Sequence, residues 1–272
     1  MTGLNKPVSD EQLERLDGKY KAIQDKLGAG ALPFEQVLGA FQSVHDGNFG
    51  DTVVPVTHQR VRKIQLIHGL FVPPEVQIEN VRHWNEQKKW GFGKNVLADL
   101  SKPPAWPDDR LVAVVLVPYL WDVQATFDGL WGIAASRQKN HWRWPDFRSD
   151  AQHLRLLQGI EHKPGLRWEV MDLAANWDRK DGVSPESVRS AASSPHAGIL
   201  AAAAHHPKWV QAMDGVKLPH VWIPGYEATI PGCGRWQCVP YLVFYRDDRE
   251  VHFGADDRCH RNPLCAVPAL RG

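Results

Sequence analysis

The sequence has little net charge and no long apolar run. Its 272 residues carry 32 lysines and arginines against 31 aspartates and glutamates. A net charge of +1 gives no overall attraction to nucleic acid or to an anionic membrane, so we expect no nucleic-acid partner. The longest apolar runs, residues 111–117 and 199–204, are far shorter than the roughly 20 residues that cross a bilayer, so we expect no membrane insertion. The first residues lack the apolar core of a secretory signal, which predicts a cytoplasmic protein.

Catalytic signatures are also missing. The chain contains no H-E-x-x-H, G-x-S-x-G, complete phosphate-binding loop or C-x-x-C motif. His196, His205 and His206 flank an alanine-rich segment, and because adjacent histidines do not share a helix face we interpret them as packing residues. We therefore expect no catalytic residues, no cofactor and no metal site, and so a protein that is not an enzyme.

Four cysteines lie within the last 40 residues: Cys233, Cys238, Cys259 and Cys265. Their spacing, C-x4-C and then C-x5-C, fits neither a zinc ribbon nor a redox motif. Free thiols, disulfides and a metal shell completed by His252 and His260 all remain open. We favour free thiols, because thiols stay reduced in the cytoplasm.

The apolar patterning predicts an α+β protein. Three parts are expected: an N-terminal helical unit over 1–50, a strand–helix segment with a linker over 51–105, and a ligand-binding domain over 106–272. The periodicity predicts helices over 9–27, 33–44, 74–89, 122–138, 149–158 and 194–206, and strands over 62–72, 111–117 and 166–174.

The pattern of the last 54 residues predicts an all-β segment. Strands are expected over 219–226, 236–245, 250–256 and 265–270, with a hairpin turn over 246–249. Period-two alternation places Leu242 and Phe244 on one face, opposite Val251 and Phe253. Tyr241, Val243 and Tyr245 then share the other face with Glu250, His252 and Gly254. We expect the first face to be apolar and the second to be mixed and wettable.

The composition of the tail differs from that of the rest of the chain. Residues 241–265 contain no tryptophan, methionine, glutamine or lysine, and Glu250 is their only glutamate. An AAC or AAT codon cannot become a codon for any of these five residue types when only its adenines are randomised. Ordinary strand and turn preference is the alternative explanation.

Four strings of the sequence resemble a known family. Residues 164–170 (PGLRWEV), 194–200 (SPHAGIL), 206–210 (HPKWV) and 221–226 (VWIPGY) resemble uncharacterised bacterial proteins whose last thirty or so residues differ sharply between copies. These look like variable proteins of diversity-generating retroelements, and the likeness covers roughly 110–272. It implies a C-type-lectin-like C-terminal domain that binds ligands through a diversified surface. Residues 266–272 are only loosely similar to the family's closing strand.

The combined interpretation is a protein that binds an unknown protein or surface ligand and catalyses no reaction. The candidate ligand-binding residues are Tyr241, Tyr245, Arg246, His252, Asp256, Asp257, Arg258, His260, Arg261 and Asn262. One alternative is an oxidase similar to formylglycine-generating enzymes, which would use Cys259 and Cys265 as a pair. Another is a structural or assembly protein of phage origin that oligomerises through its N-terminal helices. The sequence specifies neither the ligand, nor calcium dependence, nor the oligomeric state.

Overall fold

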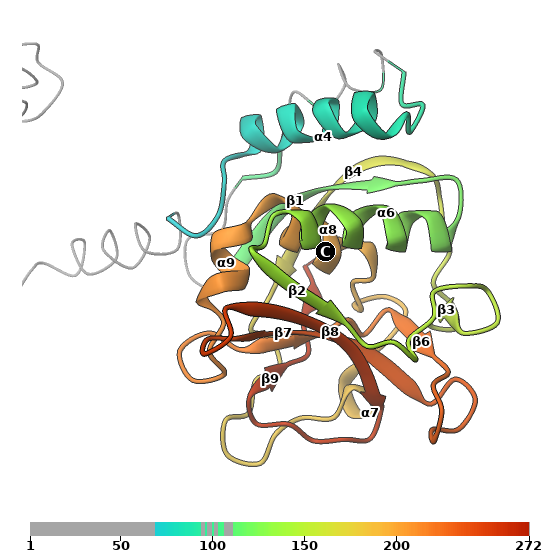
Figure 1. Cartoon of the computed structure of the whole chain (residues 1–272), viewed down its shortest axis with the longest axis vertical. Coiled ribbons are helices and arrows are strands. Elements are labelled where there is room, and N and C mark those ends of the chain that lie inside the picture. The colour runs from blue at the N-terminus through green and yellow to red at the C-terminus, as the bar shows by residue number, and fades with distance from the viewer. Residues whose placement is uncertain (1–68, 94–95, 97–99, 101–102, 106–110, 272) are drawn as a thin grey trace, which may run out of the picture. The chain divides into compact units, whose positions relative to one another are not determined.

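The computed structural model describes residues 69–93, 96, 100, 103–105 and 111–271 (Figure 1). The chain divides into Met1–Arg60 and Val61–Gly272, and every described residue belongs to the second unit. The predicted unit 1–50, with its helices over 9–27 and 33–44, lies outside the described residues, as does most of the predicted strand over 62–72. At the predicted end of that strand, residues 69–71 form a turn and a bend.

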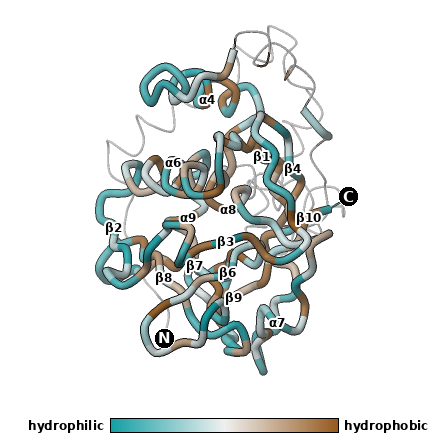
Figure 2. The backbone as a smooth tube through the Cα atoms, turned by 90° about the vertical axis from the view of Figure 1, so that its right-hand side faces the viewer, coloured by the Kyte–Doolittle hydropathy of each residue, from teal (hydrophilic) through white to brown (hydrophobic). Residues whose placement is uncertain are grey.

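The described unit is a mixed α and β structure built on two sheets. The smaller sheet has the order β1-β4-β10, formed by Val112–Tyr119, Gly165–Asp172 and Ala269–Leu270. Both β1 and β10 run antiparallel to β4, so the last described strand lies in the same sheet as the first described strand (Figure 2). All eight residues of β1 are buried, which confirms the strand predicted from its continuous apolar run.

The larger sheet has seven strands. Its main path is β2-β8-β7-β5-β9, and β3 and β6 extend it beside β7. In chain order the strands are β2 (Asn140–Arg143), β3 (Leu154–Leu156), β5 (His220–Trp222), β6 (Tyr226–Ala228), β7 (Cys238–Tyr245), β8 (Glu250–Asp257) and β9 (Cys265–Ala266). Two pairings are parallel, β2 with β8 and β5 with β9, and the others are antiparallel. The predicted strands over 236–245 and 250–256 and the hairpin between them are confirmed. The predicted strand over 219–226 is instead two strands, β5 and β6, separated by residues 223–225. The predicted strand over 265–270 is divided between β9 and β10, which lie in different sheets.

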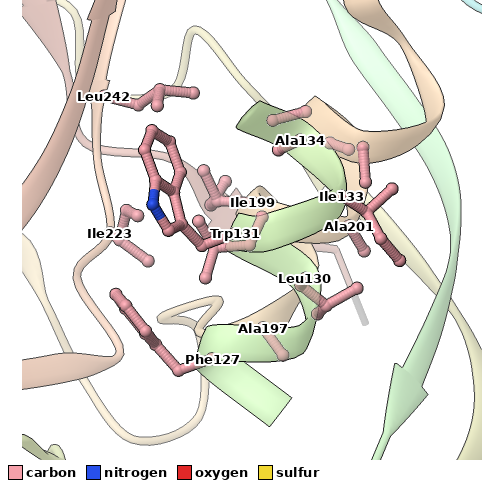
Figure 3. Packing of buried hydrophobic residues seen from close by; sticks show 14 of the residues in the cluster. Phe127, Leu130, Trp131, Ile133, Ala134, Ala197, Ile199, Ala201, Ile223 and Leu242 are labelled. Atoms are coloured by element: carbon pink, nitrogen blue, oxygen red, sulfur yellow. The ribbon is translucent and has the colours of Figure 1, made fainter. Parts of the chain in front are cut away.

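Two helices fill the space between the sheets. α6 (Val123–Ser136) begins at Asp122, whose side chain accepts a hydrogen bond from the Ala125 amide, and α8 (Ala197–His205) is buried along its whole length. The small side chains of α8 let it pack closely between β1 and α6 (Figure 1). Figure 3 shows Trp131 of α6 among Ile199, Ile223 and Leu242, at the centre of this core.

Among the described residues, the outer edge of β1 is bonded by a side chain and not by a strand. Gln77 belongs to α4 (Pro74–Lys88) and is completely buried. Its amide nitrogen donates to the Val114 carbonyl at 2.8 Å, and its amide oxygen accepts from the Leu116 amide at 2.9 Å. Gln77 thus makes two of the hydrogen bonds that a neighbouring strand would make, and it occupies this part of the edge.

The remaining helices are short. α9 (Pro207–Ala212) follows α8 directly, and α7 (Pro185–Val188) is a single turn in the otherwise irregular segment before α8. Within the described residues, no helix is both long and apolar enough to cross a membrane.

The helix predicted over 149–158 is wrong. Residues 149–158 form a turn followed by β3, not a helix. The Asp150 carboxylate accepts a hydrogen bond from the Gln152 amide and so stabilises the turn. Residues Leu154–Leu156 then pair with β6, and the Gln124 side chain binds the Leu154 carbonyl from the other side. These long-range bonds outweigh the helical pattern of the segment.

Candidate functional site

The β7–β8 hairpin has the face pattern that the sequence predicts. Leu242 lies opposite Phe253, and Phe244 lies opposite Val251, and all four side chains point into the main core. The residues between them point to the opposite face of the sheet, which we call the outer face. In register there, Tyr241 lies opposite Gly254, Val243 opposite His252, and Tyr245 opposite Glu250.

Three aromatic rings lie together at the turn end of the outer face. Trp142 of β2 is opposite His252 in register, with the ring centroids 4.9 Å apart. Tyr245 packs edge-on against the same imidazole at 4.5 Å. Trp142 is 39% exposed and Tyr245 48% exposed, so both rings remain accessible to a partner. We call Trp142, Tyr245, His252 and Glu250 the aromatic group.

The imidazole at the centre of the aromatic group has a fixed orientation. His252 Nε2 lies 2.6 Å from Glu250 Oε2, and both side chains are about a quarter exposed. The carboxylate holds the ring in place between Tyr245 and Trp142. The group therefore combines two exposed aromatic surfaces with one partly exposed carboxylate on a sheet, which is a rigid support for binding side chains.

The other end of the outer face is not wettable. Trp222, Val239, Cys265 and Val267 form a second buried cluster there, and Val183, Val188 and Tyr241 pack against it. The covering side chains belong to α7 and the segment before it. The sequence predicts that the whole outer face is wettable, but this half is an interior surface.

Tyr241 therefore lies at the border between the two halves. Its ring contacts Trp222 edge-on at 5.7 Å, and burial raises the pKa of its hydroxyl. By strand geometry it is about 13 Å along β7 from Tyr245. It is half-buried and more constrained than Tyr245, although the sequence places the two on the same face.

The tip of the hairpin is tied to another loop. Arg246 Nη2 lies 3.1 Å from Asp214 Oδ2, in the loop after α9. Asp214 is itself fixed, because its other oxygen accepts hydrogen bonds from the amides of Val216, Lys217 and Leu218. Those bonds, together with Arg246, lower the pKa of this carboxyl group, although its partial burial acts in the opposite direction. Arg246 is largely exposed and lies beside the aromatic group in sequence.

The remaining candidates lie at the far end of β8 and in the turn after it. His260 is paired with Asp256, and Asp257 accepts a hydrogen bond from the Cys259 amide. Arg258 Nε lies 3.5 Å from Glu186 Oε2, and its carbonyl accepts from the Glu186 amide. These contacts attach the end of β8 to α7.

Arg261 and Asn262 follow in the same turn. Arg261 is exposed, whereas Asn262 pairs with Val183 through an isolated bridge and accepts a hydrogen bond from the Leu264 amide. The close approach of the Asn262 backbone also requires a glycine at position 182, where a Cβ would lie 2.8 Å from it. Asn262 is thus part of the packing between two loops.

The ten candidate residues therefore fall into two groups. Tyr245, Arg246 and His252 lie at the turn end, and the residues from Asp256 to Asn262 lie at the far end, with Tyr241 between them. Sequence reasoning missed Trp142, which comes from a strand more than 100 residues earlier. The two tryptophans at positions 142 and 144 in a short polar segment were the only local signal.

The structure contradicts the free-thiol interpretation for two of the four cysteines. Cys233 and Cys238 form a disulfide, whereas Cys259 and Cys265 are free. The disulfide closes the loop between β6 and β7, at the start of the hairpin strand. The expectation of free thiols throughout is therefore wrong for this pair, because spacing alone does not show which cysteines the chain brings together.

The two free cysteines differ in environment. Cys259 is exposed in the turn after β8, while Cys265 is buried in the second cluster. Burial raises the pKa of the Cys265 thiol to about 12, which keeps it protonated and unreactive near neutral pH. Nowhere in the described part of the chain do three histidine, cysteine, aspartate or glutamate side chains gather as a metal site.

Comparisons with models of protein families, with curated proteins and with solved structures give no match to this chain.

Proposed function

We propose that the protein binds a protein or surface ligand through the turn end of the outer face, and that this surface is diversified between copies of the gene. The observation that carries the proposal is the aromatic group. Trp142 and Tyr245 expose large aromatic surfaces on either side of His252. Exposed tyrosine and tryptophan on rigid supports are typical of binding surfaces, because they give large contacts at low entropic cost.

The division of the hairpin supports diversification. The side chains that stabilise the unit, Leu242, Phe244, Val251 and Phe253, all point inward. Tyr245, His252 and the residues of the turn point outward, so substitutions there leave the main core unchanged. The C-type-lectin-like fold belongs to the same proposal. It is supported by the small sheet in which β1 and β10 flank β4, and by the larger sheet that carries the hairpin.

A binding experiment tests the proposal directly. The triple variant W142A/Y245A/H252A removes the three rings of the aromatic group and keeps every inward-facing side chain. A phage-displayed random peptide library is panned against the wild-type protein, and enriched peptides are then tested against the variant. We expect peptides that bind wild type and lose affinity for the variant, while the unfolding midpoints of the two proteins remain close.

The control uses exposed residues away from the outer face. E79A/R82A changes two exposed side chains of α4 that pair with each other. Peptides that bind both variants equally well would contradict the proposed surface. The diversification itself is tested in the genome, where we expect a near-copy of the 3′ end that differs at adenines, beside a reverse transcriptase gene. Its absence would restrict the proposal to ligand binding by a fixed surface.

A further inference from the structure

Three outer sheet edges of the unit are bonded by groups from other segments. On the outer edge of β1, the Gln77 side chain bonds the backbone. On that of β3, the Leu154 carbonyl accepts a hydrogen bond from the Gln124 side chain at 3.0 Å. On that of β10, the Leu270 amide donates to the Ser193 carbonyl at 2.7 Å. At each of these edges a backbone group that could pair with a further strand is therefore already used.

The outer edge of β2 differs from these three. The Trp144 amide, directly after β2, donates to the Phe253 carbonyl of β8 at 2.9 Å. Backbone polar groups alternate in direction along a strand, so those of Trp142 also point toward β8. The N–H and C=O groups of His141 and Arg143 point the other way, and nothing in the described part of the chain bonds them. We call these four groups the open edge of β2.

The open edge lies on an exposed strand that is fixed in place. Asn140 and His141 are both exposed. The Asn140 side chain donates to the Asp248 carbonyl at 3.1 Å, and the Arg143 guanidinium donates to Asp128 Oδ1 at 3.0 Å. These contacts hold both ends of β2, so its outer donors and acceptors keep the spacing that an added strand requires.

A hollow of about 630 Å³ lies where β2 ends. Its lining includes Arg143, the last residue of the strand, together with Phe147 and the first turns of α6. The Arg143 guanidinium stacks over Phe147, 5.2 Å from its ring centroid, and forms part of the wall. The hollow is open to solvent, so a chain that pairs with β2 has space for a side chain at the Arg143 end.

The charges of the hollow favour a basic side chain. Its charged lining residues are Asp122, Asp128, Asp150, Arg143 and Arg148, so three carboxylates and two arginines give a net charge of −1. Arg143 is already bonded to Asp128. Asp122 and Asp150 use only their Oδ1 atoms for hydrogen bonds among the residues that the structure describes. Their Oδ2 atoms can therefore accept hydrogen bonds from a lysine or arginine of a partner.

We propose that the partner presents an extended peptide segment, which adds a strand to the open edge of β2 and places a lysine or arginine side chain in the hollow. Main-chain hydrogen bonds contribute affinity in this mode of recognition, and side-chain pockets contribute specificity. An outward side chain of the added strand lies about 5 Å from Trp142, which connects the open edge to the aromatic group. The inference rests on the function proposed above and deepens it by naming the class of ligand.

Strand addition also fits a surface that varies between copies of the gene. The four groups of the open edge belong to the backbone, and β2 lies about 100 residues before the hairpin that carries the variable side chains. Main-chain bonds do not depend on which side chains that hairpin presents. The open edge can therefore contribute to binding in every copy, while the hairpin sets the preference for particular peptides.

Methylation of the peptide backbone tests strand addition on the wild-type protein. The probes are the peptides enriched in the panning experiment above, synthesised with single N-methyl groups and measured by fluorescence polarisation with the full chain. We expect affinity losses of about tenfold or more at every second position and small changes between them, because alternate N–H groups of an added strand point toward β2. Losses without this period of two, or no losses, would overturn the proposal.

A proline at position 141 tests the same edge from the side of the protein. The His141 N–H points away from β8, so H141P removes no bond of the existing sheet and blocks the open edge. It should weaken peptide binding by about tenfold or more. H141A keeps the N–H and should bind within about twofold of wild type. Equal affinities of H141P and H141A would overturn the proposal, and if H141P does not fold, the N-methyl series decides.

The role of the hollow is tested by removing charge without removing hydrogen bonds. D122N/D150N keeps the Oδ1 acceptors and should weaken peptides that carry a lysine or arginine by about threefold to tenfold. The same peptides with norleucine at that position should not distinguish the variant from wild type. D146N changes an exposed carboxylate that does not line the hollow and is the control. Basic peptides that bind D122N/D150N as tightly as D146N would overturn the assignment of the hollow.

The outcomes separate this inference from the proposed function. Peptides that lose affinity for W142A/Y245A/H252A but bind H141P normally would support the proposed surface and overturn strand addition. Peptides that depend on the open edge but not on the three rings would support strand addition and contradict the proposed surface. If panning yields no peptide, the inference is overturned, because an extended peptide is the ligand that it names.

Discussion

The ring of Tyr241 lies directly over Gly254, the residue opposite it on β8. A Cβ at position 254 would lie 2.7 Å from the Tyr241 hydroxyl oxygen and 2.8 Å from its Cζ atom. The absence of a side chain at Gly254 therefore allows the tyrosine to cover the backbone of β8 and to reach Trp222. This contact fixes the border between the buried and the exposed halves of the outer face.

Replacing Gly254 with alanine should displace the Tyr241 ring. We expect G254A to lower the free energy of unfolding by about 1–3 kcal/mol, as overpacking does in other well-packed sites. Urea unfolding followed by tryptophan fluorescence measures the change. G132A is the matched control, because a Cβ on Gly132 of α6 would meet no neighbouring atom within 4 Å, and it should leave stability unchanged or raise it by up to about 1 kcal/mol. A G254A protein as stable as wild type would show that Tyr241 is free to turn away.

The register of the hairpin was predictable, but the covering of its outer face was not. Period-two alternation suffices to pair Leu242 with Phe253, because each strand presents one face to the core. Val183 and Val188 bury the other end of the outer face from a segment more than 50 residues away, which a local pattern does not report. The parallel pairing that places Trp142 beside His252 also joins segments far apart in sequence, so a local pattern does not report it.

The surroundings of Glu169 show the same limit. From the sequence, His196 is interpreted as a packing residue, and Glu169 is only a member of the strand predicted over 166–174. Only the packing of α8 against β4 brings Glu169 beside the first turn of the helix. The glycine at position 198 is explained by that contact, whereas the sequence alone indicates an ordinary helix start.

Three buried histidines should make the unit sensitive to acid. Burial lowers the pKa of His196 and His205 to about 3 and that of His206 well below its ordinary value of 6.5. The unfolded chain therefore binds more protons below pH 6.5, and stability falls as the pH falls. A histidine that stays neutral in the folded state costs about 2 kcal/mol at about pH 5. Glu169 acts in the opposite direction, because its raised pKa makes stability fall as the pH rises.

Urea unfolding at about pH 7.5 and about pH 5 measures this dependence. We expect a clear loss of stability at the lower pH, since burial also lowers the pKa of His220 and four histidines then oppose one glutamate. H83Q removes an exposed histidine of α4 and should leave the pH dependence as in wild type. Equal stability at the two pH values would mean that the three imidazoles are protonated in the folded state.

The buried carboxylate of Glu227 should be essential for stability. Glu227 Oε2 accepts hydrogen bonds from Arg155 at 2.7 and 2.9 Å, and Oε1 accepts one from Arg189 at 3.2 Å. The Arg189 side chain is only 5% exposed and keeps a second carboxylate, because its Nη2 also lies 2.7 Å from Glu186 Oε2. E227Q therefore removes one of the two counterions of Arg189 and the partner of Arg155, and we expect a loss of about 1–3 kcal/mol in urea unfolding. E161Q breaks an exposed pair with Lys163 and should cost less than about 1 kcal/mol. Similar losses in the two variants would contradict a buried ion pair.

The disulfide between Cys233 and Cys238 should stabilise the unit even though its loop is short. Closing a loop of this length in the unfolded chain contributes about 2 kcal/mol, so the double variant C233S/C238S should lose about that much. Wild type in dithiothreitol should lose stability by a similar amount, whereas the double variant should not respond to the reductant. C259S changes an exposed free thiol and serves as the control, with no expected effect on stability. If wild type purified without reductant shows four reactive thiols after denaturation, the pair is reduced in the isolated protein. In that case the free-thiol interpretation from the sequence would apply to all four cysteines.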